Sequence, residues 1–351
     1  MFESFASSQS VVTLSGLTIT GGNTFSDGGG ILSNGGSLVI EDSIFAGNIA
    51  GASGGAIHAN TGSVTITGSS IFDNRSESLS TFAGGGGIGS SAADVTIFNS
   101  SVTGNFAESN GGGVHSENGN LTFINSTLSD NNSDGPGGGI SGLNGDIVVT
   151  RSTVSNNTAR FAAGGGILSG PGAVTVSSST ISGNSSSFDG SGIQSFEGPL
   201  TITDSTITQN ETTNSGGAGI STGFPLEIVQ PFLTVRNSII AGNEAANSDS
   251  DLVLTPGVGV DIASSLIGSN FNTSLAPAPL GSPDVNGNFI GTLSDPINPL
   301  LGDLADNGGP TQTHALLEGS PAIDAGISFS TTDQRGETRP CLLYTSPSPR
   351  D

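Results

Sequence analysis

A repeat of about 26 residues runs through most of the chain and constrains its fold more strongly than any other feature. Each copy contains a glycine-rich element that ends in an aliphatic residue, followed by a Ser-x-aliphatic-x-x-Asn element. The glycine-rich elements end at Ile31, Ile57, Ile88, Val114, Ile140, Ile167, Ile193 and Ile220. Insertions at about 76–84 and 223–231 lengthen two copies, and an irregular first copy over 16–23 makes ten. Repetition at this period is typical of solenoids, in which each copy forms one coil.

Short alternating runs precede each serine and predict strands with one buried face, as in Ser-Val-Thr-Ile-Thr-Gly over 63–68. Two apolar columns result, the second position after the serine supplies a third, and the glycine-rich element supplies a fourth. Four inward aliphatic residues cannot offset the conformational entropy lost on ordering one coil, so neighbouring coils must stabilise each other. We therefore predict an all-β, right-handed parallel β-helix with three strands per coil and about ten coils of 26–27 residues.

One asparagine recurs five residues after each serine, at a predicted corner of the coil. Asparagine side chains can bond the backbone groups that are freed where a strand bends, and identical amides on stacked coils can bond one another. We predict a structural ladder of Asn48, Asn74, Asn105, Asn131, Asn157, Asn184, Asn210, Asn243 and Asn270. A leucine-rich repeat has a similar period but is disfavoured, because its Leu-x-x-Leu-x-Leu pattern and any helical periodicity are absent.

The charge balance narrows the classes of partner. The chain has 30 acidic residues against 7 basic ones, all of them arginine, and a formal charge of −23. Such a chain is poorly suited to bind nucleic acid or an anionic membrane surface. No run approaches the roughly 18 apolar residues of a spanning helix, the single cysteine excludes a disulfide framework, and the first residues show no signal peptide.

Two kinds of motif resemble known bacterial surface proteins. Residues 54–57 (GGAI) and 45–48 (FAGN) resemble the paired GGAI and FxxN repeats of polymorphic outer-membrane proteins and autotransporter passengers. Residues 298–326 resemble the choice-of-anchor Q segment that closes many secreted β-helix repeat proteins. The resemblance covers most of the chain and implies a pectin-lyase-like solenoid, export, and display or anchoring at a cell surface. It implies no established chemistry.

The two ends of the chain depart from that family pattern. After 333–340 the expected closing strand is missing, and 341–351 resemble a translated sequencing-library adapter, which is excluded from fold reasoning. The repeat is already under way at Val11, so earlier coils, a cap and a signal peptide are expected upstream. We predict a truncated or irregular lead-in over residues 1–10 and a parallel β-helix over 11–270. A linker over 271–295 then leads to an incomplete anchor-type cap over 296–340, and 341–351 are an adapter artefact.

One charged column stands out when the copies are stacked. Glu77, Glu108, Asp134 and Arg160 each lie eight residues after a repeat serine, on four successive coils. Acids about 5 Å apart repel one another or hold a cation, which makes Glu77, Glu108 and Asp134 candidate ligands for calcium. Carboxylate pairs of this spacing also act in retaining glycosidases, so Glu108 and Asp134 are the candidate catalytic residues. The alternative is a solvated run of charges on exposed turns, which is the commoner case.

Other titratable residues do not form a predicted site. A polysaccharide lyase needs an acid cluster with a basic residue on an outward face, but Asp94 and Asp146 lie two coils apart. His58 and His115 share a register about 10 Å apart, too far to share a zinc ion, and His314 is expected to be structural.

A faint likeness to a calcium loop begins at Asp284, but Phe289 occupies the position where that loop requires glycine. We therefore predict no calcium loop there and no cofactor, with calcium on the acidic column as the one open case.

We predict a secreted or cell-surface bacterial protein with a structural and adhesive display role, and we expect no catalysis. The alternative is a carbohydrate-active enzyme, a polysaccharide lyase or hydrolase of the pectin-lyase-like fold. The expected partners are glycans or surface proteins. We expect no nucleic acid, no membrane span in this fragment and a monomeric chain. The expected location is extracellular or at the cell surface, in association with the outer membrane.

Overall fold

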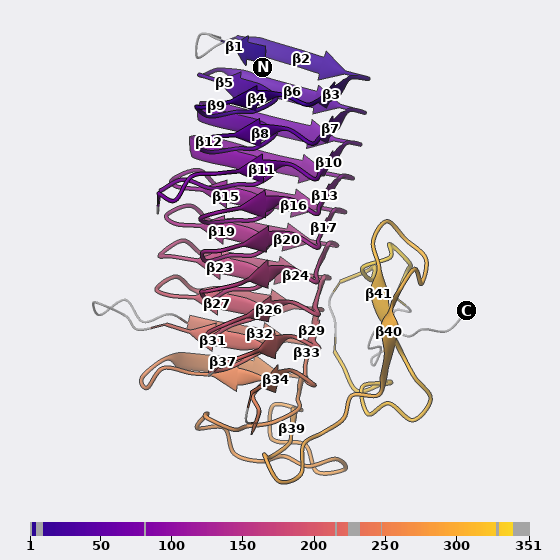
Figure 1. Cartoon of the computed structure of the whole chain (residues 1–351). Helices are drawn as coiled ribbons and strands as arrows, with labels where there is room; N and C mark the ends of the chain where they lie inside the picture. The colour runs from indigo at the N-terminus through magenta and orange to yellow at the C-terminus, as the bar shows by residue number, and fades with distance from the viewer. Residues whose placement is uncertain are drawn as a thin grey trace.

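The structure is a computed structural model that describes residues 2–4, 10–80, 82–214, 216–223, 232–246, 248–327 and 330–339. Within these residues the chain winds into a rod of stacked coils, and a C-terminal segment lies beside the rod (Figure 1). The adapter-like residues 341–351 lie outside the described residues. Nowhere in the described ranges is there a helix that could cross a membrane.

Three sheets run along the rod in the described residues. Sheet A contains β1 (Phe2–Ser4), β2 (Val11–Ser15), β5 (Ile31–Ser33), β6 (Ser37–Glu41), β9 (Ile57–Thr67), β12 (Ile88–Phe98), β15 (Val114–Ser116), β16 (Leu121–Ile124), β19 (Ile140–Gly142), β20 (Ile147–Thr150), β23 (Ile167–Ser169), β24 (Val174–Ser177), β27 (Ile193–Ser195), β28 (Leu200–Thr203), β31 (Ile220–Thr222), β32 (Phe232–Arg236), β36 (Leu252–Val253) and β37 (Gly259–Ala263). Sheet B contains β3 (Thr18–Thr20), β7 (Ile44–Ala46), β10 (Ser70–Phe72), β13 (Ser101–Thr103), β17 (Thr127–Ser129), β21 (Thr153–Ser155), β25 (Thr180–Ser182), β29 (Thr206–Thr208), β33 (Ile239–Ile240), β38 (Leu266–Ile267) and β39 (Phe289–Ile290). Sheet C contains β4 (Asn23–Thr24), β8 (Ile49–Ala50), β11 (Arg75–Ser76), β14 (Phe106–Ala107), β18 (Asn132–Ser133), β22 (Thr158–Ala159), β26 (Ser185–Ser186), β30 (Glu211–Thr212), β34 (Glu244–Ala245) and β35 (Ser248–Asp249).

Successive coils pair in parallel, one repeat apart. In sheet A, Val64 of β9 pairs with Val95 of β12, which pairs with Leu121 of β16. In β9 and β12 the strand of sheet A is continuous, whereas other coils divide it into two pieces joined by a turn. The predicted all-β solenoid, with three sheets and about ten turns, is confirmed.

The interior of the rod is aliphatic. The columns predicted to point inward are fully buried along most of the rod, with Phe45 and Phe123 the largest side chains in them. Near the C-terminal end of the rod, Val260 is only partly buried and packs against this core. Each coil therefore contributes few apolar side chains, but the stack makes one continuous core.

Two corners of each coil require the left-handed backbone conformation. Asp42, between β6 and β7, has φ of 47°, and Gly47, between β7 and β8, has φ of 62°. Equivalent positions along the rod are mostly occupied by aspartate, asparagine or glycine, the residues that tolerate this region. The corners fix where the chain leaves each sheet, and so fix which side chains face solvent.

Residues 298–327 and 330–339, here called the strap, fold back along the outside of sheet B (Figure 1). The strap contains an antiparallel hairpin of β40 (Leu301–Ala305) and β41 (Thr313–Leu316). A second apolar cluster joins Leu316 and Ala322 of the strap to Ile239 and Leu266 of sheet B. Within the predicted linker, β39 adds a further strand to sheet B by pairing with β38.

Candidate functional site

The asparagine column lies in the buried corner between sheets B and C. From Asn48 to Asn210, each side chain donates from Nδ2 to Oδ1 of the ladder residue on the next coil, at 2.8–3.0 Å. The same Oδ1 also accepts the backbone N–H of the preceding ladder residue. Each Nδ2 also donates to a backbone carbonyl, as Asn131 does to Val102 at 2.9 Å. The hydrogen-bonding capacity of this column is therefore used to hold the coils together.

The ladder ends differently from the sequence expectation. Asn243 donates from Nδ2 to Oδ1 of Asp251 at 2.8 Å, and the backbone N–H of Ser269 donates to Oδ2 of the same carboxylate. Asn270, the last predicted member, instead donates to the carbonyl oxygen of Leu275 at 2.9 Å. Asn270 therefore lies outside the ladder, and Asp251, which is 1% exposed, takes the next place in it.

The first two acids of the charged column contact an arginine that the column did not include. Arg75 bonds Oε1 of Glu77 from Nε at 3.1 Å and bonds Oε1 of Glu108 from Nη2. Sequence reasoning missed Arg75 because it lies directly after a ladder asparagine, two positions before the column. Glu77 and Glu108 therefore share one counter-charge.

The other acid of the column is also paired. Arg160 lies 3.4 Å from Oδ1 of Asp134, atom to atom, and its guanidinium is 5.2 Å from the centre of the Phe106 ring. The Arg75 guanidinium lies 4.5 Å from the same ring. The candidate residues are brought together as a half-exposed network of alternating charge around Phe106. No group of three or more His, Cys, Asp or Glu side chains in the described residues is arranged to hold a metal ion.

Other acids outside the column bond to backbone groups. Oδ1 of Asp94 accepts the N–H of Asn120 at 2.9 Å, and Oδ1 of Asp146 accepts that of Ala173 at 2.8 Å. Oδ1 of Asp284 accepts the N–H groups of Asn286 and Asn288, both at 2.9 Å. These carboxylates close turns and cap neighbouring coils.

The histidines are buried in the rod wall or under the strap. His58 and His115 are 3% and 1% exposed, and Gly89 lies between them in the ladder of sheet A. Burial lowers the pKa of His58 and lowers that of His115 to about 4. Nε2 of His314 is hydrogen-bonded to the Ser182 hydroxyl at 2.8 Å. Burial lowers the pKa of His314 as well.

Among the described residues, the most exposed phenylalanines lie along one edge of the rod, which sequence reasoning missed. Phe25, Phe82, Phe161 and Phe188, here called the phenylalanine edge, are 102%, 67%, 72% and 48% exposed. All four lie on turns that lead from sheet C to the next strand of sheet A. Phe161 and Phe188 each follow a ladder asparagine by four residues, and this shared spacing is the signal that could have revealed them.

The strap covers sheet B, away from the phenylalanine edge, which lies between sheets C and A. Gln334 is 8% exposed, and its Nε2 lies 3.0–3.2 Å from four oxygens, among them the carbonyl of Ser152 and the hydroxyl of Thr153. Arg339 bonds Oδ1 of Asp204 at 2.8 Å.

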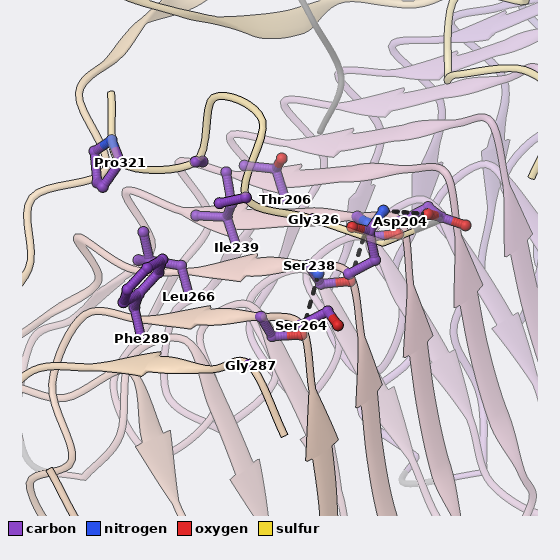
Figure 2. A pocket seen from close by; sticks show the side chains of 15 residues that line it. Asp204, Thr206, Ser238, Ile239, Ser264, Leu266, Gly287, Phe289, Pro321 and Gly326 are labelled. Carbon is purple, nitrogen blue, oxygen red and sulfur yellow. Dashed lines mark hydrogen bonds between the residues drawn. The ribbon is translucent and has the colours of Figure 1, made fainter. Parts of the chain in front are cut away.

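A pocket lies where the strap meets the last strands of sheet B (Figure 2). Pro321 of the strap lines one side, and Ile239, Leu266 and Phe289 line the other. Asp204 also lines this pocket, but it is bonded to Arg339 and Asn237. The pocket walls are therefore apolar side chains and paired polar groups.

Comparison with known proteins places this fold. A sequence profile described as a right-handed β-helix region matches residues 4–168 and 90–266. No curated protein matches the sequence. Among solved structures, a mutant of a periplasmic alginate epimerase is similar, with 10% identity and a TM-score of 0.29 over 66% of this chain and 75% of that one. A likeness of this size carries no argument about activity. Because the profile matches span residues 4–266 of 351, the chain belongs to the right-handed β-helix family.

Proposed function

We propose that this chain is a structural, adhesive rod of the cell surface, which attaches to a partner through one flank. The phenylalanine edge carries this proposal. Exposed apolar side chains that are scattered singly need no explanation, but a contiguous group of them marks an interaction site. Phe161 and Phe188 are exposed at the same position of neighbouring coils, whose turns are hydrogen-bonded to each other. Arg160, which precedes Phe161, stacks over the part-buried ring of Phe106.

The state of the acidic column supports binding rather than catalysis. A general acid and a nucleophile need free carboxyl groups that face a substrate. Glu108 is bonded to Arg75 and Asp134 to Arg160, so both carboxylates are held by a counter-charge. The same pairing disfavours a calcium ion on this column, because the cation would have to displace guanidinium groups.

The location, oligomeric state and domain boundaries belong to the same proposal. The GGAI and FxxN repeats support an extracellular or surface location that is associated with the outer membrane. The net charge of −23 supports a monomer, because identical rods repel one another. We place the β-helix at 11–270, the linker at 271–295 and the anchor-type cap at 296–340. The strap makes up most of this proposed cap. It docks on the outside of sheet B instead of continuing the coils, which supports treating the cap as separate from the β-helix.

An adhesion assay tests the proposal. Beads coated with the chain are allowed to settle on surfaces that carry either glycans or extracellular matrix proteins. We expect adhesion to at least one surface, and we expect loss of it when Phe25, Phe82, Phe161 and Phe188 are all changed to serine. Val285→Ser is the matched control, because Val285 is 102% exposed but lies near the end of the rod, away from the edge. Absence of adhesion, or adhesion that the fourfold variant retains, would overturn the proposal.

The enzymatic alternative has its own measurement. The purified chain is incubated with a panel of polysaccharides, with and without calcium, and unsaturated or reducing ends are measured. Products that disappear in Glu108→Ala and Asp134→Ala would replace the adhesive function with a catalytic one. We expect no such products.

A further inference from the structure

Phe161 and Phe188 occupy the same position of two successive coils. The backbone N–H of Phe188 donates to the carbonyl of Ala162 at 3.3 Å, and that of Ser187 donates to Ala159 at 3.2 Å. The two turns are therefore hydrogen-bonded to each other, and their residues are offset along the rod by one coil, about 5 Å. Both rings are exposed, at 72% and 48%.

Next to Phe161 and Phe188, hydrogen-bonding groups follow along the rod. Arg160 precedes Phe161, and its guanidinium lies 3.4 Å from Asp134 and 5.2 Å from the centre of the Phe106 ring. The hydroxyl of Ser187 donates to the carbonyl oxygen of Arg160. From Phe106 to Phe188 the surface thus offers rings, a guanidinium and hydroxyl oxygen over three coil steps, about 14 Å.

Charge limits what this surface can bind. Two arginines and three acids share the network, so its local charge is close to neutral. The chain as a whole carries −23 without lysine. An anionic polymer or a lipid headgroup is repelled by that field, and so is a second copy of the rod. A cationic ligand would be attracted by the field, but at this surface it would meet the guanidinium groups of Arg75 and Arg160. The ligand that fits best is therefore uncharged.

An uncharged ligand must also match the repeat of the surface. A pyranose ring offers a C–H face that packs on a phenyl ring, and its edge carries hydroxyls that hydrogen-bond to guanidinium and carboxylate groups. The length of one sugar unit in an extended chain is close to the rise of one coil. We propose that Phe106, Arg160, Phe161 and Phe188 form a binding surface for a neutral polysaccharide chain that lies along the rod axis. This inference rests on the proposed adhesive function and names its ligand.

Affinity electrophoresis through gels that contain a soluble polysaccharide measures this binding. The neutral probes are mannan, hydroxyethyl cellulose and xyloglucan, and the anionic probes are alginate and polygalacturonate. We expect at least one neutral probe to retard the full chain, and we expect Phe161→Ala with Phe188→Ala to weaken that retardation at least tenfold. Phe196→Ala is the matched control, because Phe196 is 41% exposed on a different turn, between β27 and β28. Unchanged melting temperatures establish that the variants remain folded.

Three results would overturn the inference: no retardation by any neutral probe, equal weakening by Phe196→Ala, or stronger retardation by an anionic probe. None of them decides the adhesive function itself. Beads that adhere to a protein-coated surface and lose adhesion in the fourfold phenylalanine variant would retain that function and assign it to a protein ligand.

Discussion

Asn243 donates from its side-chain amide to Oδ1 of Asp251 at 2.8 Å, so a carboxylate ends the asparagine ladder. A carboxylate suits this place because the groups that face it are donors: the backbone and side-chain N–H groups of Asn243 and the backbone N–H of Ser269. Unlike an asparagine, an aspartate side chain has no amide N–H groups, so it can accept from the ladder but does not extend it to a further coil. The ladder stops where the chain leaves the regular coil.

Replacement of Asp251 by alanine should destabilise the C-terminal coils. Three buried donors would lose their acceptor, and each unsatisfied group costs about 1–3 kcal/mol. We expect the free energy of unfolding to fall by about 3 kcal/mol or more, measured by denaturant titration, with faster amide exchange near Asn243. Asn270→Ala is the control and should lower it by no more than about 1 kcal/mol, because Asn270 makes one part-buried bond. Equal losses from the two variants would contradict the assignment of Asp251 to the ladder.

The buried His115 predicts a pH dependence of stability. Its pKa is about 4 in the folded chain against 6.5 for an exposed histidine, so between these values the unfolded chain binds more protons. The stability from the neutral imidazole is complete above pH 6.5 and falls as the pH drops towards 4, by about 3 kcal/mol in total.

His115→Gln should remove most of this slope, because glutamine does not titrate and the equivalent position of another coil already carries Gln194. Denaturant titrations at a series of pH values measure it. Since burial lowers the pKa of His58 as well, some slope should persist in the variant. A variant whose stability falls as steeply as that of the wild type would contradict the prediction.

Gln334 should control the docking of the strap without affecting the rod. Gln334→Ala removes the contacts to Ser152 and Thr153 and leaves the Thr180 hydroxyl without its acceptor. We expect the strap to open more easily by about 1–3 kcal/mol, seen as faster hydrogen exchange over β41. Exchange in the core strand β21 should not change. Glu337→Ala, an exposed position of the same segment, is the control and should leave the exchange of β41 as it is.

The sequence predicted the coils well because buried positions are chemically strict. An inward residue must be apolar on every coil, so its column repeats and can be read directly. Asn270 fits the same spacing but not the ladder, because the ladder needs proximity in space and the excursion through β35 places Asp251 there first. The spacing of residues in the sequence predicts their positions in space only where the coils are regular.

Solvent-facing features escaped prediction for the converse reason. Nothing in the packing of the rod requires Phe161 or Phe188, so phenylalanine does not recur at that position on every coil. The reach of Arg75 to Glu108 depends on a side-chain conformation rather than on register. The contact of Gln334 with Ser152 joins residues 182 apart in the chain and has no periodic signal.

The paired state of the acidic column predicts little response to calcium. Glu108→Gln removes one bond to Arg75, whose side chain is 40% exposed, and half-exposed ion pairs of this kind contribute at most about 1 kcal/mol. We expect the melting temperature of this variant to stay close to that of the wild type. Millimolar calcium should shift neither, because Arg75 and Arg160 already pair with Glu77, Glu108 and Asp134. Thermal melts with calcium and with a chelator measure this. A calcium-dependent rise in the wild type that Glu108→Gln abolishes would establish a cation site and reopen the catalytic reading of the column.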